Sequence, residues 1–274
     1  MKTHSMTTWH MAIIVFSLLL ACTRVDADAG FDHGLWTQDL QQFVTLRREG
    51  VASDVNYAAW RQARESLDRY LSKLAAVEKG TYQSWPKAQQ LAFLINAYNA
   101  YTVQLILDHP DIDSIKDIGG WFRQPWSIEF ASLLGQTRSL DEIEHQLIRS
   151  DYFSEPRIHF AVNCASVGCP LLRREAYVGK HLDRQLGDQT QRFLQDKSRN
   201  KIVGSRLVLS PIFKWYRDDF ESNWGGYNRL EDFLLDHPAA LDLTQQQKKL
   251  LKNRQLDIEY SEYDWSLNQT SPHH

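Results

Sequence analysis

Apolar residues recur at helical spacing through most of the chain after residue 35. Residues three and four apart lie on one face of a helix, so this spacing predicts helices that each bury an apolar stripe. The strongest pattern, over 85–108, is apolar nearly all round and indicates a buried helix. Other helices are predicted over 36–48, 57–76, 139–149, 181–195, 211–220, 227–235 and 243–251.

Four short segments rich in β-branched and aromatic residues predict strands over 157–164, 201–203, 206–210 and 256–260. The middle two form a hairpin that turns at Gly204-Ser205. Helices outnumber strands and the order is mixed, which indicates an α+β fold, mainly helical around a small β-sheet. No linker rich in Pro, Gly or Ser interrupts residues 35–268, so we expect a single domain there.

The N-terminus has the pattern of an export signal. Residues 12–21 form an apolar run that is too short for a spanning helix, which needs about 20 residues. The run has the length of a signal-peptide core, and Leu19-Leu20-Ala21-Cys22 resembles a bacterial lipobox, in which the cysteine is lipidated. We therefore expect a signal peptide over 1–22 and a tether over 23–34. The alternatives are plain cleavage after Ala27 or Ala29 and an uncleaved anchor.

The residue after Cys22 bears on the location. Thr23 stands where an Asp would signal retention in the inner membrane, so the lipobox resemblance favours a lipid anchor in the outer membrane, facing the periplasm. Processing at Cys22 would leave two cysteines for chemistry, Cys164 and Cys169. In an oxidising compartment, a disulfide between them has to be considered.

Composition narrows the function only slightly. The chain is 43% hydrophobic, 24% charged and 12% aromatic, which is typical of a globular protein and excludes a disordered one. Its net charge of −3 gives no basic field, so we expect no nucleic-acid partner. The chain contains no P-loop and no GxGxxG, HExxH or GxSxG motif, and no cofactor is expected.

The first candidate for chemistry is Cys164, at the end of the predicted strand 157–164. Small residues follow it, and a thiol at such an exit can be activated by a histidine or a helix N-terminus. His159 points to the opposite strand face unless a bulge at Asn163 turns the chain. The alternatives are a buried apolar Cys164, a core His159, a disulfide to Cys169, and zinc held by His159, Cys164 and Cys169. The spacing lacks the close CxxC pairs of common zinc folds.

The second candidate is the pair Glu144 and His145 in the predicted helix 139–149. Ser139 and Glu142 have the spacing of a capping box at its start. Glu144 falls close to the apolar face, where a carboxylate needs a partner, and His145 lies at its flank. The alternatives are a Glu144 whose stem packs while its head reaches water, and an exposed surface His145.

The third candidate is the pair Asn96 and Asn99, three residues apart on one side of the predicted helix 85–108. Buried amides need hydrogen-bond partners. They could orient a catalytic histidine or hold a substrate carbonyl. The alternative is a structural hydrogen-bond network.

Five motifs stand out along the chain: FLINAYNA at 93–100, IEH at 143–145, PRIHFAVNCAS at 156–166, LSPIFKWY at 209–216 and YDWSLN at 263–268. Together they resemble the domain of unknown function 547 family, over about residues 50–268. In that family the position of Cys164 is more constant than that of Cys169, where plant members carry Ser, and plant members lack a His at 159. The resemblance therefore implies a shared site of Cys164, Glu144, His145, Asn96 and Asn99.

These residues favour a cysteine-dependent hydrolase or acyltransferase acting on an amide or thioester, as papain- or transglutaminase-like enzymes do. Cys164 would be the nucleophile and His145 its base, oriented by Glu144 or Asn99, and backbone N–H groups after Cys164 would stabilise an oxyanion. One alternative is a non-catalytic envelope module that binds a ligand or is structural. Another is a thiol redox or zinc protein. The expected partners are a small-molecule or peptide substrate and a membrane, through Cys22.

Overall fold

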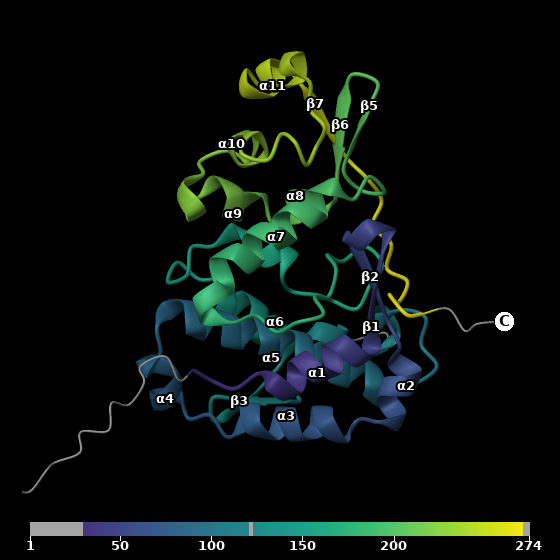
Figure 1. Ribbon diagram of the computed structural model, residues 1–274, viewed down its shortest axis with the longest axis vertical. Helices are drawn as coiled ribbons and strands as arrows, with labels where there is room; N and C mark the ends of the chain where they lie inside the picture. Colours follow the sequence, from purple (N-terminus) through teal and green to yellow (C-terminus); the bar gives the residue numbers. More distant parts are fainter. Residues whose placement is uncertain (1–29, 121–122, 271–274) are drawn as a thin grey trace, which may run out of the picture.

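The computed structural model describes residues 30–120 and 123–270 and has the expected α+β class, with many helices and small sheets (Figure 1). The predicted signal peptide, Cys22 and most of the tether 23–34 lie outside the described residues. Among the described residues, no helix combines the length and apolar character needed to cross a membrane.

The predicted helix 36–48 is wrong in its second half. Helix α1 (Gly34–Phe43) ends early, and β1 (Val44–Arg47) pairs antiparallel with β2 (Ala52–Val55). The turn between the strands, η1 (Arg48–Gly50), has positive φ at each of its residues, which no helix tolerates. This local backbone breaks the helical periodicity that the apolar residues suggest.

The predicted buried helix is confirmed as α5 (Lys87–Asp108), which is enclosed on nearly all sides. The predicted helix 57–76 is two helices, α2 (Tyr57–Gln62) and α3 (Glu65–Ala75), and both contact α5. Most of the buried apolar residues of the first half of the chain gather around α5 in one core. The other elements of this half are α4 (Lys79–Ser84), η2 (Ile115–Asp117), η3 (Pro125–Ser127), β3 (Ala131–Leu133) and β4 (Gln136–Arg138).

The predicted helix 139–149 starts with α6 (Leu140–Glu142) and continues as a π-helical turn, η4 (Ile143–Ile148). The expected capping box is present, because Ser139 and Glu142 each accept the other's backbone N–H. Turns of the π type are frequent at functional sites, and η4 carries Glu144 and His145.

The predicted strand 157–164 is wrong. Pro156 opens a short 3-10 helix, η5 (Pro156–Phe160), and the Glu155 carboxylate accepts the N–H of Arg157 as its cap. An irregular loop follows, which we call the cysteine loop (163–170). The alternating apolar residues of this segment pack into two different cores, Ile158 and Val162 into one and Phe160 into the other. Their alternation therefore reflects this packing and not a strand.

The second half of the chain builds a separate core rich in phenylalanine, around Phe160, Phe193, Phe213, Phe220 and Phe233. A three-stranded sheet of order β5-β6-β7 borders it, with the predicted hairpin β5–β6 and a parallel β6–β7 pair. The elements are η6 (Gly179–His181), α7 (Leu182–Gln195), β5 (Lys201–Val203), β6 (Arg206–Leu209), α8 (Ile212–Trp215), α9 (Arg217–Glu221), η7 (Trp224–Gly226), α10 (Leu230–Leu235), α11 (Gln245–Lys252) and β7 (Asp257–Tyr260).

After β7 the chain runs back toward the first half, as the yellow trace in Figure 1 shows. We call residues 261–270 the C-terminal strap. Its backbone bonds the cysteine loop, where Val167 N–H donates to Ser266 O at 2.8 Å, and β2, where Val55 N–H donates to Asn268 O at 2.7 Å. The strap therefore joins the two halves of the structure at the cysteines.

Candidate functional site

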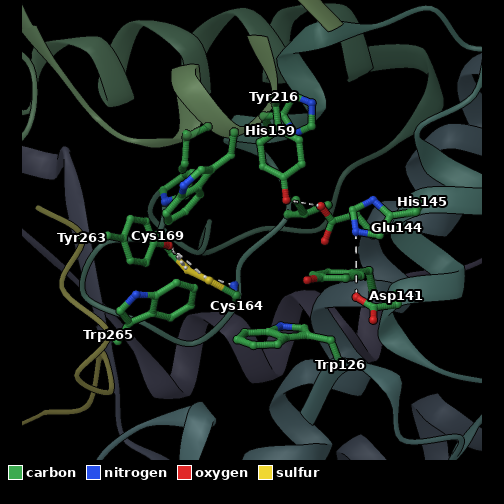
Figure 2. A pocket seen from close by; sticks show the side chains of 15 residues that line it. Trp126, Asp141, Glu144, His145, His159, Cys164, Cys169, Tyr216, Tyr263 and Trp265 are labelled. Carbon is green, nitrogen blue, oxygen red and sulfur yellow. Dashed lines mark hydrogen bonds and ion pairs between the residues drawn. A yellow bond between two sulfur atoms is a disulfide. The ribbon is translucent and has the colours of Figure 1, made fainter. Parts of the chain in front are cut away.

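A pocket of about 220 Å³ lies where both halves of the chain meet the C-terminal strap (Figure 2). Side chains from α5, η3, α6, η4, η5, the cysteine loop, α8 and the strap line it. Pockets for drug-sized ligands usually measure about 300–1,000 Å³. This one therefore fits a small molecule or a single side chain of a larger one.

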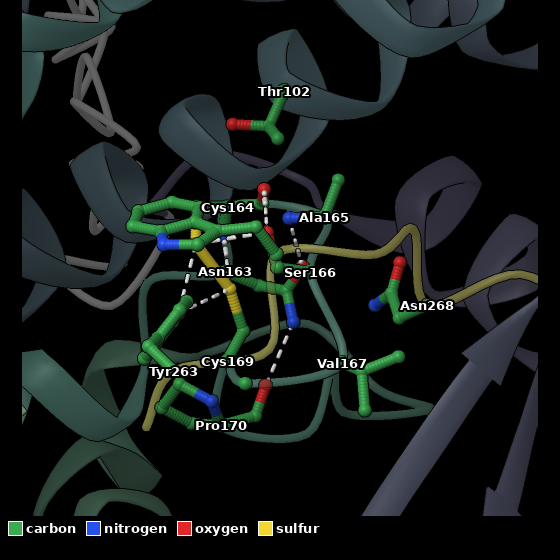
Figure 3. Close-up of a disulfide and its surroundings, with 12 residues drawn as sticks. Thr102, Asn163, Cys164, Ala165, Ser166, Val167, Cys169, Pro170, Tyr263 and Asn268 are labelled. Carbon is green, nitrogen blue, oxygen red and sulfur yellow. Dashed lines mark hydrogen bonds between the residues drawn. A yellow bond between two sulfur atoms is a disulfide. The ribbon is translucent and has the colours of Figure 1, made fainter. Parts of the chain in front are cut away.

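The two cysteines of the pocket form a disulfide, with Cα atoms 6.2 Å apart (Figure 3). The two residues differ in access, because Cys164 is half-buried and Cys169 is only 4% exposed. In this state Cys164 carries no free thiol, so it cannot act as the nucleophile of a hydrolase.

Both sulfur atoms have hydrogen-bond donors beside them. The hydroxyl of Tyr263 lies 3.2 Å from Sγ of Cys164 and 3.3 Å from Sγ of Cys169. The backbone N–H of Cys164 donates to Sγ of Cys169 at 3.0 Å. Among the described residues, no histidine makes a hydrogen bond to either sulfur. The predicted Cys164–His145 pair is therefore not formed.

Tyr263 packs directly on the cysteine loop at Gly168. A Cβ atom built on Gly168 would lie 2.8 Å from the ring of Tyr263 and 2.9 Å from the carbonyl of Asp264. Only glycine leaves room for this approach. Its absence of a side chain is what brings the Tyr263 hydroxyl onto the disulfide.

The side chain of Asn99 is hydrogen-bonded to the backbone at the start of the cysteine loop. Its Oδ1 accepts the N–H of Asn163 at 2.8 Å and its Nδ2 donates to the carbonyl of Ala161 at 3.0 Å. The Asn163 side chain in turn accepts the N–H of Ala165 and donates to the carbonyl of Pro170. Asn99 thus positions the loop and does not line the pocket.

Asn96 makes an equivalent pair of bonds elsewhere, with the N–H and carbonyl of Tyr177 at 2.9 and 2.8 Å. It also lies outside the pocket lining. Both asparagines therefore belong to structural hydrogen-bond networks, as in the alternative stated for them. Neither touches a histidine in these bonds.

Most backbone donors after Cys164, where an oxyanion site was expected, already have acceptors. The N–H of Ala165 donates to Asn163 Oδ1, that of Val167 to the carbonyl of Ser266, and that of Gly168 to the carbonyl of Asp264. Among the described residues the Ser166 N–H has no such acceptor, so an oxyanion site with two donors would require one of these bonds to break.

Glu144 is buried, at 6% exposed, and its carboxylate accepts the hydroxyl of Tyr216 at 2.7 Å. The prediction that it lies on the core face and needs a partner is confirmed, and the alternative with a solvated head is wrong. Burial, and next to it the charge of Glu144, raise the pKa of Tyr98 and of Tyr216, which keeps both phenols protonated.

His145 lies at the pocket mouth, and 41% of its side chain is exposed. Its Nδ1 lies 2.9 Å from Nη1 of Arg149 and its Nε2 lies 3.8 Å from Oδ1 of Asp141. The arginine donates to Nδ1, so that lone pair is already used. The alternative of an exposed surface histidine describes His145 better than the role of a base.

His159 is buried and belongs to a network that the sequence did not reveal. Its Nε2 donates to Oδ2 of Asp219 at 2.6 Å, and its ring stacks on Tyr216 with centroids 3.8 Å apart. Arg149 donates twice to the same carboxylate, at 2.7 and 2.8 Å. His159 is therefore the core histidine of the alternatives, bonded through Nε2 alone. Its Nδ1 is buried without a hydrogen-bond partner among the described residues, and its ring also lines the pocket.

The charges of this network oppose the effect of burial. Burial lowers the pKa of His159, and Asp219 offsets part of that effect. Burial alone would raise the pKa of Asp219, but hydrogen bonds from His159 and Arg149 lower it to about 2. At neutral pH the network therefore holds a neutral imidazole, a carboxylate and a guanidinium.

The zinc set that the sequence left as an alternative is not assembled. The sulfur atoms bond to each other and Nε2 of His159 bonds to Asp219, so these three side chains do not converge on one point. In the part of the chain that the structure describes, no group of three or more His, Cys, Asp or Glu side chains is placed to hold a metal ion.

The sequence interpretation missed most of the pocket wall. Trp126, Trp215, Tyr263 and Trp265 line it, although crowded aromatic residues by themselves suggest only packing. For Trp215, Tyr263 and Trp265 the available signal was that they lie in motifs of the same family resemblance as the cysteine segment, whereas Trp126 lies in none of those motifs.

Neither the curated proteins nor the solved structures contain a match to this chain. Residues 82–194 match the model of one protein family, and this segment contains the candidate residues from Asn96 to Cys169. Trp215, Tyr263 and Trp265 lie outside it. The match supports, for residues 82–194, the expected resemblance to the family described as "Protein of unknown function, DUF547".

Proposed function

We propose that Cys164 and Cys169 form a redox-active pair, which exchanges with a small thiol or disulfide substrate bound in the pocket. The observation that carries the proposal is the asymmetry of the pair. Cys164 is the more accessible sulfur, and Sγ of buried Cys169 has two donors, the Cys164 N–H and the Tyr263 hydroxyl. Hydrogen bonds stabilise a thiolate more than a neutral sulfur, so Cys169 is placed to be the leaving group.

The exchange follows in two steps. A substrate thiolate attacks Sγ of Cys164, the bond between the cysteines breaks, and Cys169 leaves as a thiolate held by its two donors. A second substrate thiolate then attacks the mixed disulfide and releases Cys164. Two electrons pass from the substrate, which becomes a disulfide, to the protein, which becomes a dithiol. Another disulfide reoxidises the protein, and the reverse sequence reduces a disulfide substrate.

A second candidate is the cysteine-dependent hydrolase or acyltransferase with papain- or transglutaminase-like chemistry. Its support is that Cys164, Glu144 and His145 line one pocket. It requires reduction of the disulfide and movement of His145 away from Arg149. The non-catalytic ligand-binding or structural module needs neither change, and it is the outcome expected if the disulfide proves inert.

Trapping experiments distinguish the two sulfurs. In a Cys22→Ala background, Cys169→Ser leaves Cys164 as the only thiol, and Cys164→Ser leaves Cys169. With bis(2-hydroxyethyl) disulfide as the probe, we expect the variant that keeps Cys164 to form the mixed disulfide roughly tenfold faster, because access limits attack. Intact-mass spectrometry over time measures both rates.

The control for the trapping experiment is reduction of the disulfide in protein that keeps both Cys164 and Cys169. It should be reduced by dithiothreitol without loss of the folded near-ultraviolet circular dichroism signal. Reduction that occurs only in denaturant, or equal rates for the two single-thiol variants, would contradict the exchange proposal. If reduced protein then cleaves amide or thioester probes in a Cys164-dependent manner, the hydrolase is the correct function.

We also propose that the protein is exported and anchored by a lipid on Cys22, at the outer membrane and facing the periplasm. The support is the apolar run 12–21 followed by the lipobox-like sequence, and an oxidising compartment also suits a disulfide.

Cys22→Ala should abolish this anchoring. We expect the unchanged protein to incorporate labelled palmitate and to sediment with membranes, and the variant to incorporate no label, because it lacks the thiol that would carry the lipid. Cys169→Ser is the matched cysteine control and should stay with the membranes. An unlabelled wild type in the soluble fraction would rule out the anchor.

A further inference from the structure

The pocket has an unbalanced charge. Two carboxylates line it, Asp141 at the mouth and buried Glu144 further in, and its described lining contains no lysine or arginine. Two arginines behind the wall have carboxylate partners of their own, Arg149 with Asp219 and Arg199 with Asp196. The Arg149 guanidinium lies 4.9 Å from the ring centroid of Tyr216 but does not line the pocket. The interior is therefore negative, and it favours a positively charged occupant.

We call the four rings on the wall, Trp126, Trp215, Tyr263 and Trp265, the aromatic box. Three of the contacts between them are steeply inclined, and the fourth, Trp215 on Trp265, is closer to parallel, at 25° with centroids 5.8 Å apart. Tyr263 is inclined to Trp265 by 50° with centroids 4.5 Å apart, and to Trp215 by 51° at 4.8 Å. Trp126 stands at 64° to Trp265, at 5.6 Å. Figure 2 shows Tyr263 and Trp265 on one side of the disulfide and Glu144 and Asp141 on the other, with Trp126 between them at the bottom of the view. Ring faces that surround one space attract a cation through their negative π-systems.

One ammonium group of the protein already contacts a ring of the aromatic box, that of Trp265. Nζ of Lys116 lies 3.6 Å from the ring centroid of Trp265. Lys116 does not line the pocket, so this contact is outside it, and no lysine or arginine of the described residues lines the pocket itself. The contact shows that a ring of the box binds an ammonium group in this environment.

We propose that the pocket binds a small organic cation, an ammonium or guanidinium group carried by the substrate. The charge lies against the box of Trp126, Trp215, Tyr263 and Trp265, and Glu144 supplies the counter-charge. This inference deepens the proposed function and rests on it for the reaction, since the cation would place an attached thiol beside Cys164. Cation binding itself needs no exchange chemistry, so the two are tested separately.

A neutral sugar is the other ligand that aromatic and carboxylate residues bind. Sugars stack on one exposed flat face, whereas these rings are inclined to one another by 50° to 64° at three of their four contacts, and by 25° at the fourth. A pocket of about 220 Å³ is also small for more than one residue-sized group. The geometry therefore favours the cation.

The test measures binding to the full-length protein, purified in detergent with its disulfide intact. The probes are tetramethylammonium, its uncharged analogue neopentyl alcohol, and glucose, each followed by calorimetry and tryptophan fluorescence. We expect tetramethylammonium to bind roughly tenfold more tightly than neopentyl alcohol, and glucose not to bind.

Two variants identify the residues. Glu144→Gln keeps an acceptor for Tyr216 but removes the charge, and it should weaken tetramethylammonium binding roughly tenfold while leaving neopentyl alcohol unchanged. Glu262→Gln removes a charge from the exposed neighbour of Tyr263, outside the pocket, and should have no effect. Trp126→Leu removes one wall and should weaken the cation as well, which keeps the test valid if Glu144→Gln does not fold.

Several results would overturn the inference: no binding of tetramethylammonium, equal binding of the neutral analogue, binding of glucose alone, or equal effects of Glu144→Gln and Glu262→Gln. The same measurements on the Cys164→Ser, Cys169→Ser double variant separate the two proposals. Cation binding without exchange in the trapping experiment would contradict only the redox function, and exchange without cation binding would contradict only this inference.

Discussion

Replacing Asp219 with asparagine is expected to lower the free energy of unfolding by about 3 kcal/mol, because it removes the charge from a buried network. Asp219 is 5% exposed and accepts hydrogen bonds from both His159 and Arg149. An Asn side chain has one oxygen and one NH₂ group, so it must present a donor to one of these donors. Arg149 keeps its charge but loses its counter-ion, and urea denaturation measures the loss.

The effect should depend on pH in a defined direction. The pKa of Asp219 is lowered by folding from its ordinary 3.8 to about 2. A carboxyl group with a lowered folded pKa contributes stability above its ordinary pKa and loses it as the pH falls through the folded value. The difference between wild type and Asp219→Asn should therefore stay constant down to about pH 4 and shrink below it.

The neighbouring residue provides the control for this prediction. Asp218 is exposed, so Asp218→Asn should change the free energy of unfolding by no more than about 0.5 kcal/mol. Similar losses for the two variants, or a difference that grows in acid, would show that the network is not what Asp219 stabilises.

Replacing Arg199 with methionine is expected to cost about 3 kcal/mol and to loosen the cysteine loop. Arg199 is 7% exposed and donates to the carbonyls of Val167, Gly168 and Cys169, at 3.0, 2.6 and 2.6 Å. It also pairs with the buried carboxylate of Asp196 at 2.8 Å. Methionine fills much of the space but leaves these acceptors without this donor.

Two measurements check the Arg199 prediction. Urea denaturation gives the stability loss, and the rate of disulfide reduction by dithiothreitol should rise because the loop backbone is less constrained. Arg206→Met is the control, since Arg206 pairs with Glu259 where both side chains are nearly half exposed, and such pairs contribute about 0–1 kcal/mol. An unchanged reduction rate in Arg199→Met would mean that the strap and Asn99 hold the loop without the arginine.

Local sequence patterns predicted the parts of the fold that local patterns determine. Helix α5, helix α7 and the β5–β6 hairpin are present as predicted because one periodicity runs through each of them. The strand predicted over 157–164 failed because side chains from elsewhere fix that backbone, Asn99 above all. The predicted helix 36–48 failed at a positive-φ turn, which periodicity does not report.

The site divides in the same way. Glu144 and Cys164 were found because a carboxylate on an apolar face and a cysteine before small residues are local signals. The pairing of His159 with Asp219 and the approach of Tyr263 to the sulfurs join residues 60 and more apart in sequence. The single-domain boundaries and the likeness to papain- or transglutaminase-type folds stay predictions.

The C-terminal strap imposes an order on assembly. Tyr263 follows Cys169 by 94 residues, and the bonds from the strap to Ala165, Val167 and Gly168 need residues 264–268. A chain emerging from the ribosome or a translocon therefore presents both cysteines long before their surroundings exist. The loop closure between Cys164 and Cys169 is short and can precede the strap, whereas the pocket is completed only when the strap has been synthesised, including Tyr263, 94 residues after Cys169. Oxidation of the pair and maturation of the pocket are thus separate events in the life of each molecule.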